Sequence, residues 1–324
     1  MVLARELGKR ALLLLLVLFL VTLFTSALLS LVPGDPVDTL VPLADSPQTE
    51  EIKAEVRENI GLDDPFLVRY WDWVTGFVTG DFGDYYRVSG SDPVSETIAE
   101  ALPVSLQLVV YSQLLSLIIA IPLGVASAYR AGTMFDKGAN TTMFALLAVP
   151  NFVLGLALAY YFGVWLNWVP PSGYVPFSDD AVEHVKRMIL PAISLAAAQI
   201  AVYMRLLRSD MIQTLQEDFI QMARSKGISD RRVLWRHALR PSTLTLLTVA
   251  GLNVGTLIGG AVVIEVLFSI PGLGYFLGQA IFQRQYEALQ SFVALIAVIY
   301  VVVNFLVDVL YTVVDPRIRH ARAR

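Results

Sequence analysis

Long uncharged runs of apolar residues recur along the chain, separated by polar segments. A membrane-spanning helix needs about 20 mostly apolar residues, and six runs meet or approach that length. They are Ala11–Val32, Ala101–Tyr129, Gly138–Ser178, Met188–Met204, Pro241–Ile264 and Ala288–Val307. The third run is too long for one span, so we expect a helix near Thr141–Val164, followed by a turn-rich loop over Asn167–Pro176. The pattern predicts an all-α fold, a polytopic membrane protein with six transmembrane helices.

Composition supports a membrane protein. Apolar residues make up 56% of the 324 residues and charged residues 16%, whereas soluble domains average roughly 45–50% and 25%. A soluble fold of this composition would expose large apolar patches. The chain has no cysteine, which excludes disulfides, thiol nucleophiles and Cys-ligated metals. Its net charge of −4 gives no reason to expect a nucleic-acid partner.

The positive charges predict an orientation, because Lys and Arg concentrate in cytoplasmic segments of membrane proteins. With six spans, both termini and two of the connecting loops lie on one side, and these segments hold 17 of the 24 basic residues. The other side contains Pro33–Glu100, with 15 acidic and four basic residues. Lys186 and Arg187 fit this arrangement least well, because they fall on the outer side. We therefore expect both termini in the cytoplasm.

The first span is expected to stay uncleaved. Its apolar run of 22 residues is longer than the core of about 7–15 residues found in a signal peptide. The predicted organisation is then a cytoplasmic N-terminus (1–10), a first transmembrane helix (11–32), an extracytoplasmic segment (33–100), a membrane core (101–313) with a cytoplasmic loop (205–240), and a cytoplasmic tail (314–324).

The extracytoplasmic segment is expected to be partly helical. Aromatic residues at Phe66, Tyr70, Trp73 and Phe77 recur at helical spacing. Two interpretations are open. The aromatic stripe packs against the segment itself or the lipid headgroup region, or it is a platform for an external partner.

The fifth apolar run carries a glycine stripe. Gly251, Gly255 and Gly259 recur every four residues, and small residues at this spacing allow another helix to approach closely. We expect a helix contact along this stripe.

Signatures of catalysis are missing from the sequence. It contains no phosphate-binding G-x-x-x-x-G-K-[ST], no H-E-x-x-H and no G-x-S-x-G. The three histidines, His184, His237 and His320, are far apart in the sequence. We therefore expect neither a metal site nor an enzymatic activity in this chain.

The longest loop on the side of the termini runs from Arg205 to Arg240. Met211–Arg224 has an apolar helical face, Lys226 and Gly227 interrupt it, and Asp230–His237 predicts a second short helix. The loop is either a solvated basic segment that only fixes orientation, or a short helix that inserts into a groove on a cytoplasmic partner.

The residues of this loop favour the second interpretation. The stretch DFIQMARSKGI (218–228), followed by VLWRHALRP (233–241), resembles the cytoplasmic loop of ABC-transporter permeases, and most closely the dipeptide/oligopeptide/nickel importer type. Gln221-Met222-Ala223 stands at the position of the E-A-A triplet of that family, and Gly227 at its glycine. The first two triplet positions differ from the general pattern, and Pro241 falls one residue later than the family's proline.

Further segments resemble the same family in the same order. They are LVPGDP (31–36), GLDDP (61–65), GDFG (80–83), EVLFSIPGLG (265–274) and VDPRIR (314–319). The long external loop after the first span resembles the first of the two permeases that such importers pair.

The resemblance implies a permease subunit of an ATP-driven importer in the plasma (inner) membrane of a prokaryote. The implied partners are a second permease, two ATP-binding subunits and an extracytoplasmic substrate-binding protein. ATP and Mg are expected in the partner subunits, and no cofactor in this chain. The expected cargo is di- or oligopeptides, with nickel, glutathione or oligosaccharide as alternatives. A stand-alone channel or a secondary transporter would leave the loop without a role. An intramembrane enzyme would need two facing acids at one depth, whereas Glu265 and Asp308 are expected near opposite faces of the membrane.

The resemblance and the polarity pattern together name candidate site residues. Those expected to couple to the ATPase subunits are Phe219, Ile220, Met222, Ala223, Arg224, Lys226 and Gly227. Polar residues within the spans are candidates for lining the translocation path; these are Gln107, Asn151, Gln199, Asn253 and Glu265. For the four amides, hydrogen bonding between helices is the alternative role, and for Glu265 it is a helix-end hydrogen bond. Asp308 is expected to be a structural acid within the membrane.

Overall fold

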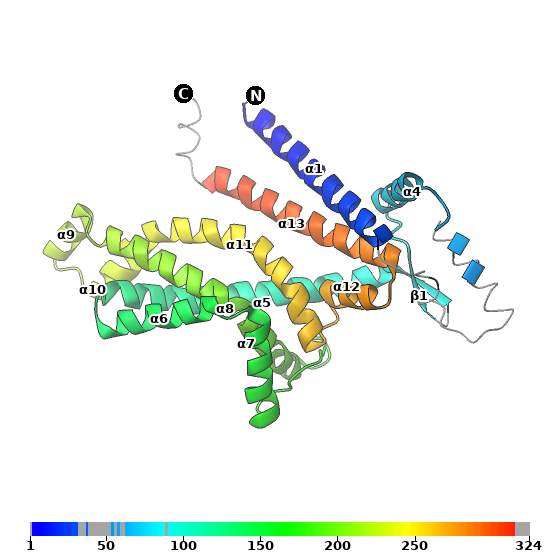
Figure 1. The fold of residues 1–324 in the computed structure, drawn as a ribbon. Helices are drawn as coiled ribbons and strands as arrows, with labels where there is room; N and C mark the ends of the chain where they lie inside the picture. The colour runs from blue at the N-terminus through cyan, green and yellow to red at the C-terminus, as the bar shows by residue number, and fades with distance from the viewer. Residues whose placement is uncertain are drawn as a thin grey trace. The chain divides into compact units, whose positions relative to one another are not determined.

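The computed structural model of the protein describes residues 2–31, 37, 53–54, 57–58, 62–87 and 90–314 (Figure 1). Within these ranges, the side chains of residues 2–7, 9–11, 87, 90, 308 and 310–314 are not described. The chain divides into two compact units, Met1–Ser105 with Pro271–Val302, and Leu106–Ile270 with Val303–Arg324. Part of the expected extracytoplasmic segment 33–100, chiefly residues 33–36 and 38–52, and the tail beyond residue 314 lie outside the described residues.

The first unit combines long apolar helices with one small hairpin. Its helices are α1 (Val2–Leu31), α4 (Phe66–Thr79), α12 (Leu273–Phe282), the start of α5 (Val94–Tyr129) and most of α13 (Tyr286–Val314). The hairpin consists of β1 (Asp84–Arg87) and β2 (Gly90–Pro93), which pair antiparallel with Asp84 opposite Pro93. The all-α prediction therefore holds for the membrane helices and needs this addition outside them.

A distant glutamine explains why the hairpin escaped prediction. The carboxamide of Gln285 accepts a hydrogen bond from the Tyr86 backbone N–H (3.0 Å) and donates one to the Tyr86 carbonyl (2.5 Å). It thus pairs with β1 as a neighbouring strand would. Such support comes from the far end of the chain, so no local sequence window reveals it.

The aromatic stripe predicted over Phe66–Phe77 forms the inner face of α4. This helix follows Pro65 and ends at Gly80, whose φ of +95° continues the chain in the left-handed region. Tyr70 is buried, and its ring lies 6.3 Å from those of Phe66 and Trp73. The helical period inferred from the aromatics is confirmed.

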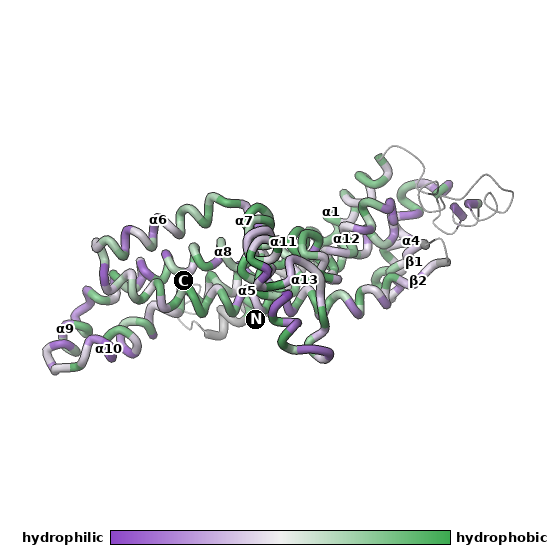
Figure 2. Tube along the Cα trace, turned by 90° about the horizontal axis from the view of Figure 1, so that it is seen from below, coloured by the Kyte–Doolittle hydropathy of each residue, from purple (hydrophilic) through white to green (hydrophobic). Residues whose placement is uncertain are grey.

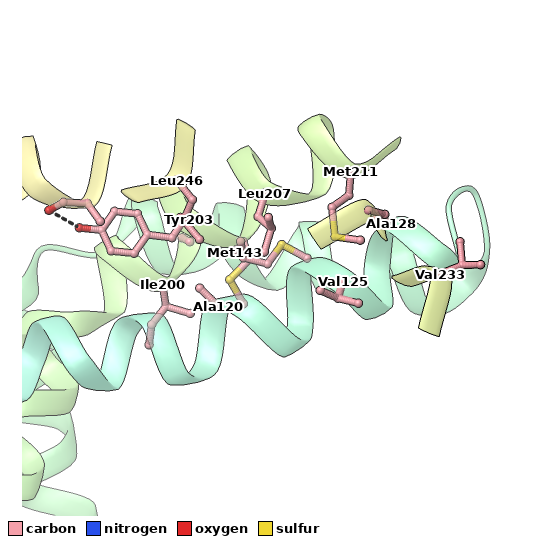
Figure 3. Packing of buried hydrophobic residues seen from close by; sticks show 14 of the residues in the cluster. Ala120, Val125, Ala128, Met143, Ile200, Tyr203, Leu207, Met211, Val233 and Leu246 are labelled. Carbon is pink, nitrogen blue, oxygen red and sulfur yellow. Dashed lines mark hydrogen bonds between the residues drawn. The ribbon is translucent and has the colours of Figure 1, made fainter. Parts of the chain in front are cut away.

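The second unit is a helical bundle with a buried apolar core. Helix α8 (Ala181–Thr214) packs against α6 (Met134–Ala148), α7 (Asn151–Leu158) and α11 (Leu239–Phe268). Figure 3 shows the core between these helices, in which Met143, Leu207 and Leu246 are almost completely buried. The remaining elements are η1 (Ala159–Trp165), α9 (Asp218–Ser225), α10 (Asp230–Arg232) and η2 (Val233–Ala238).

Five helices of the described chain are long and apolar enough to cross a membrane, and six spans result if one bent pair counts as a single span. The five are Leu12–Leu31, Val94–Tyr129, Ala181–Thr214, Asp230–Phe268 and Tyr286–Val307, and the bent pair is Met134–Ala148 with Asn151–Trp165. The polytopic membrane fold is confirmed.

The continuous third helix expected over Thr141–Val164 is wrong. The chain bends by 102° between α6 and α7. Val149 has an extended backbone (φ −95°, ψ 123°), as expected for a residue before proline, and Pro150 cannot continue the hydrogen-bond ladder of α6. An uncharged run shows that residues avoid water, but it does not show where the helix axis turns.

The helix expected over Met211–Arg224 is also wrong in its extent. Met211 belongs to the last turn of α8, and α9 begins only at Asp218. Residues Leu215–Glu217 form the turn between them, closed by hydrogen bonds from Leu215 N to Met211 O and from Glu217 N to Thr214 O. The apolar positions on both sides of the turn kept helical spacing, because both helices bury a face in the same core.

One glycine of the predicted stripe makes the expected helix contact. A Cβ atom on Gly251 would lie 2.8 Å from a methyl group of Val307 on α13, so only glycine fits there without a shift. Gly259 has open space around its Cα, and the next residue, Gly260, instead packs against Leu195 of α8. The stripe therefore does not follow one straight seam.

Candidate coupling loop and membrane path

The loop between α8 and α11 presents a short helix with two different faces. On α9, the side chains of Ile220 and Ala223 are buried, whereas Phe219 and Met222 are 46% and 58% exposed. The buried pair joins the core that contains Met211, Val233 and Ala238. The helix is therefore fixed to the bundle by one face and offers apolar side chains on the other.

A glycine ends α9 in the conformation that its position requires. Gly227 has φ of +73°, a region that other L-residues rarely adopt. The Gly227 N–H donates to Arg224 O, and the Ile228 N–H donates to Ala223 O at 3.2 Å. These bonds satisfy carbonyls at the helix end and turn the chain back toward α10.

Basic residues surround this turn. Arg224, Lys226, Arg231 and Arg232 are all exposed, and Figure 2 shows hydrophilic residues gathered at α10. The second predicted helix, Asp230–His237, is present as α10 and η2, but it continues into α11 without a break. The last part of the loop thus forms the first turns of the long helix that continues as α11, and it is not a separate short helix.

The base of the loop is held by polar contacts that sequence reasoning missed. Asp136, at the start of α6, is buried and accepts hydrogen bonds from Arg208 Nε and Nη2, both at 2.6 Å. It also accepts from Ser127 Oγ on α5 (2.7 Å) and from the Gly132 N–H (2.9 Å). One carboxylate therefore joins α5, α6 and α8 where these helices approach the loop.

Two further contacts extend this anchoring. The Tyr129 hydroxyl at the end of α5 donates to Asp230 at the start of α10 (3.1 Å). Thr214, the last residue of α8, hydrogen bonds to Ser242 of α11. Part of this network had a local signal, because Thr133 and Asp136 have capping-box spacing; the Thr133 side chain does accept from the Asp136 N–H.

The candidates for the translocation path lie at separate places in the bundle. Gln199, in α8, is buried, and its Oε1 has no hydrogen-bond partner among the described residues. Glu265, near the end of α11, is also buried. Asn151 begins α7, and Asn253 is half-buried in α11. Asp308 is in α13, and its side chain is outside those described.

Gln107 has a defined partner in the loop before α8. The Tyr174 hydroxyl donates to Gln107 Oε1 at 3.2 Å. Burial raises the pKa of the Tyr174 hydroxyl above its usual value. Gln107 therefore ties α5 to this loop, whereas the alternative role considered for the four amides was hydrogen bonding between helices.

Long apolar helices, joined by a loop with an anchored and half-exposed short helix, define a multi-pass membrane protein. Comparison with known proteins specifies the family. Residues 120–320 match the binding-protein-dependent transport system inner membrane component, and residues 3–109 match the N-terminal part of the same kind of component. The chain belongs to this family and is a permease subunit of an ABC importer.

Relatives match over nearly the whole chain. A putative peptide transport system permease protein of Brucella abortus is 38% identical, over 94% of this chain and 95% of its own length. The oligopeptide permease AppB of Bacillus subtilis is 37% identical, over 96% and 98%. The di/tripeptide permease DppB of Pseudomonas aeruginosa is 37% identical, over 98% of both.

A solved structure supports the fold. The crystal structure of an amino acid ABC transporter superposes with a TM-score of 0.51 at 14% identity, covering 67% of this chain and 94% of that one. The family description places the chain in a multi-subunit system of the inner membrane that includes a binding protein.

Proposed function

We propose that the chain is the first permease of a peptide importer and forms the translocation pathway with a second permease. The relatives named above, similar over almost their full length, are peptide permeases, and this supports di- or oligopeptides as the cargo. The observation that carries the proposal is the anchored α9, with Phe219 and Met222 exposed on a helix whose other face is buried.

In this proposal α9 lies in the cytoplasm, in a groove of an ATPase subunit. Exposed Phe219 and Met222 supply apolar contact, and Arg224 and Lys226 meet acidic groups at the rim of the groove. ATP and Mg bind to the ATPase subunits, and the permease chain binds no cofactor. An extracytoplasmic binding protein delivers the cargo from the other side.

The anchoring contacts explain how a movement would pass into the membrane. Because Ile220 and Ala223 belong to the same buried core as Met211 of α8 and Leu246 of α11, a movement of α9 would be passed to those helices. The Asp136–Arg208 pair adds α5 and α6 to the same body. Closure of the ATPase pair on ATP would therefore move the helices together, as in other rigid-body transitions.

Gln199 is the path candidate that the geometry favours most. An amide oxygen buried without a partner is costly, and a peptide N–H is a donor of the kind it lacks. In the proposal, Gln199 receives such a donor as cargo passes, whereas Gln107 serves as a structural tie.

Cross-linking tests the role of α9. The chain has no cysteine, so Met222→Cys places a unique thiol in it, with Thr142→Cys on an exposed position of α6 as the control. In the assembled transporter, Met222→Cys should cross-link to an ATPase subunit and Thr142→Cys should not. If neither forms the product, or both do equally, α9 is not the contact.

The cargo is tested on the reconstituted transporter with its binding protein. Uptake of a labelled tripeptide should depend on ATP and should be reduced by unlabelled di- and oligopeptides. If nickel, glutathione or an oligosaccharide drives uptake and peptides do not, the peptide assignment fails while the importer assignment stands. ATP-independent flux would indicate a channel or a secondary transporter.

A further inference from the structure

Helix α4 has a second apolar face, which lies next to its aromatic stripe, about 100° further around the helix. Leu67, Trp71, Val74 and Val78 follow one another at spacings of four, three and four, which places them on one side of the helix. Leu67, Trp71 and Val78 are 69%, 63% and 79% exposed. Soluble surfaces rarely present a continuous stripe of large apolar side chains, so this face points to an interaction surface.

The inner face of α4 packs against the middle of the first span. The Tyr70 hydroxyl hydrogen bonds to Thr22 of α1 at 2.9 Å, and the Tyr70 ring contacts Phe19 edge to face. Thr22 lies in the span Leu12–Leu31, nine residues before its end. At 1.5 Å per residue, the contact is about 13 Å inside that end of the span.

The charged residue of α4 next to this contact reaches the other way. Arg69 Nη2 donates to Ser30 at 2.9 Å, one residue before the span ends. A guanidinium group that extends to the edge of the apolar zone while its helix lies deeper is typical snorkelling. Together, Arg69 and Tyr70 place the first half of α4 beside the half of the span that ends at Leu31.

The polar sector of α4 faces a cavity. A space of about 300 Å³ is lined by Arg69, Asp72 and Gly76 of α4, and by acidic groups that include Asp81 and Glu287. The charged side chains of α4, Arg69 and Asp72, therefore line this cavity and need not face whatever covers Leu67, Trp71 and Val78. The outward stripe itself contains no charged residue.

We infer that α4 is embedded in one leaflet of the bilayer, with Leu67, Trp71 and Val78 against lipid acyl chains. The neighbouring surface of α1 supports lipid as the occupant. Its Leu20, Phe24 and Leu28 are more than half exposed, as expected of a lipid-facing span, and α4 packs on this helix at the same depth. The partner is thus a lipid surface rather than the binding protein or the second permease.

This inference rests on α1 crossing the membrane and not on the cargo or on the coupling role of α9. Embedding would change the meaning of the aromatic stripe. The stripe becomes a helix contact inside the membrane boundary, rather than a platform for an external partner.

Spin labels on single cysteines test the inference in the full transporter reconstituted in liposomes. Leu67→Cys, Trp71→Cys and Val78→Cys each receive a nitroxide. Leu20→Cys on α1 is the lipid control, and Asp63→Cys, at an exposed position before α4, is the water control. Relaxation of each label is measured with oxygen, which partitions into lipid, and with a water-soluble nickel chelate.

The three α4 labels should match the Leu20 control. We expect oxygen to relax them as strongly as the label at 20, and the nickel chelate to relax them several-fold less than the label at 63. Strong relaxation by the chelate at 67 and 78 would overturn the inference, because the face would then be in water. Protection from both reagents would overturn it too, because protein would cover the face.

Two controls keep the outcome clear. Leu67 and Val78 are exposed side chains, so their replacements test the inference even if Trp71→Cys fails to fold. ATP-driven peptide uptake is measured on the same labelled samples. Uptake that persists while the labels report water would refute the embedding of α4 and leave the importer function intact.

Discussion

Asp136 shows how much one side chain contributes to this bundle. It is buried at the start of α6, and its two oxygens pair with the fork of Arg208 on α8 while Ser127 of α5 donates to one of them. A bidentate pair of this kind fixes geometry as well as adding energy. The capping-box spacing of Thr133 and Asp136 was visible in the sequence. The contact with Arg208, 72 residues away, was not, because it depends on how α6 packs against α8.

Replacing this carboxylate should destabilise the protein strongly. In Asp136→Asn, Arg208 loses its counter-charge in a largely buried site, which costs about 3 kcal/mol. Thermal unfolding in detergent should show a clearly lower midpoint. Arg208→Lys keeps the charge but loses the fork, so its midpoint should fall between those of wild type and Asp136→Asn. An unchanged midpoint for Asp136→Asn would show that the pair contributes no stability.

Phe219 tests the exposed face of α9 without disturbing the core. Its side chain is about half exposed, so Phe219→Asp should leave the folded fraction unchanged while placing a charge in an apolar contact. We expect substrate-stimulated uptake to be lost and basal ATP hydrolysis to persist, with Phe219→Leu retaining most uptake. Normal uptake by Phe219→Asp would contradict the proposed contact with the ATPase.

At the scale of whole elements, the sequence predicted helices better than their ends. The aromatic period of Phe66–Phe77 located α4 because that side of the helix packs inward, with Tyr70 against α1 and Trp73 hydrogen-bonded to Ser291. The bend at Pro150 and the turn at Leu215–Glu217 were missed, because apolar residues continue through both. Helix α9 itself had a local signal in Glu217 and Asp218, acids at a helix start that favour the positive end of its dipole.

Two glycines of α11 give a matched test of helix packing. A Cβ on Gly251 would meet Val307 at 2.8 Å, whereas one on Gly259 meets nothing within 4 Å. Gly251→Ala should therefore lower the unfolding midpoint, because overpacking costs about 1–3 kcal/mol. Gly259→Ala should be neutral or slightly stabilising, because alanine favours the helix. Equal midpoints for the two variants would mean that α11 and α13 do not approach closely at Gly251.

For the whole molecule, the family and the polytopic membrane fold followed from sequence, whereas the path for cargo did not. Apolar runs and the loop motif are local features, and each was sufficient for its conclusion. The path depends on which polar side chains face one another across helices, as the tie between Tyr174 and Gln107 illustrates. It depends as well on a second permease whose side chains this sequence does not contain.

The orientation predicted from the basic residues can be measured on intact cells. Ser225→Cys in α9 should react with a membrane-impermeant thiol reagent only after permeabilisation. Ser178→Cys, in the exposed loop before α8, should react in intact cells, because that loop belongs to the acidic side. The reverse result would place α9 outside and exclude contact with an ATPase.

The two hydrogen bonds between the Gln285 side chain and the Tyr86 backbone have a consequence for biosynthesis. The two residues are 199 positions apart in the sequence. A ribosome that adds about 10 residues per second therefore synthesises Tyr86 roughly 20 s before it synthesises Gln285. During that interval the edge of β1 lacks the two hydrogen bonds to Gln285. A truncated or stalled chain that ends before Gln285 would keep this edge of β1 without its partner.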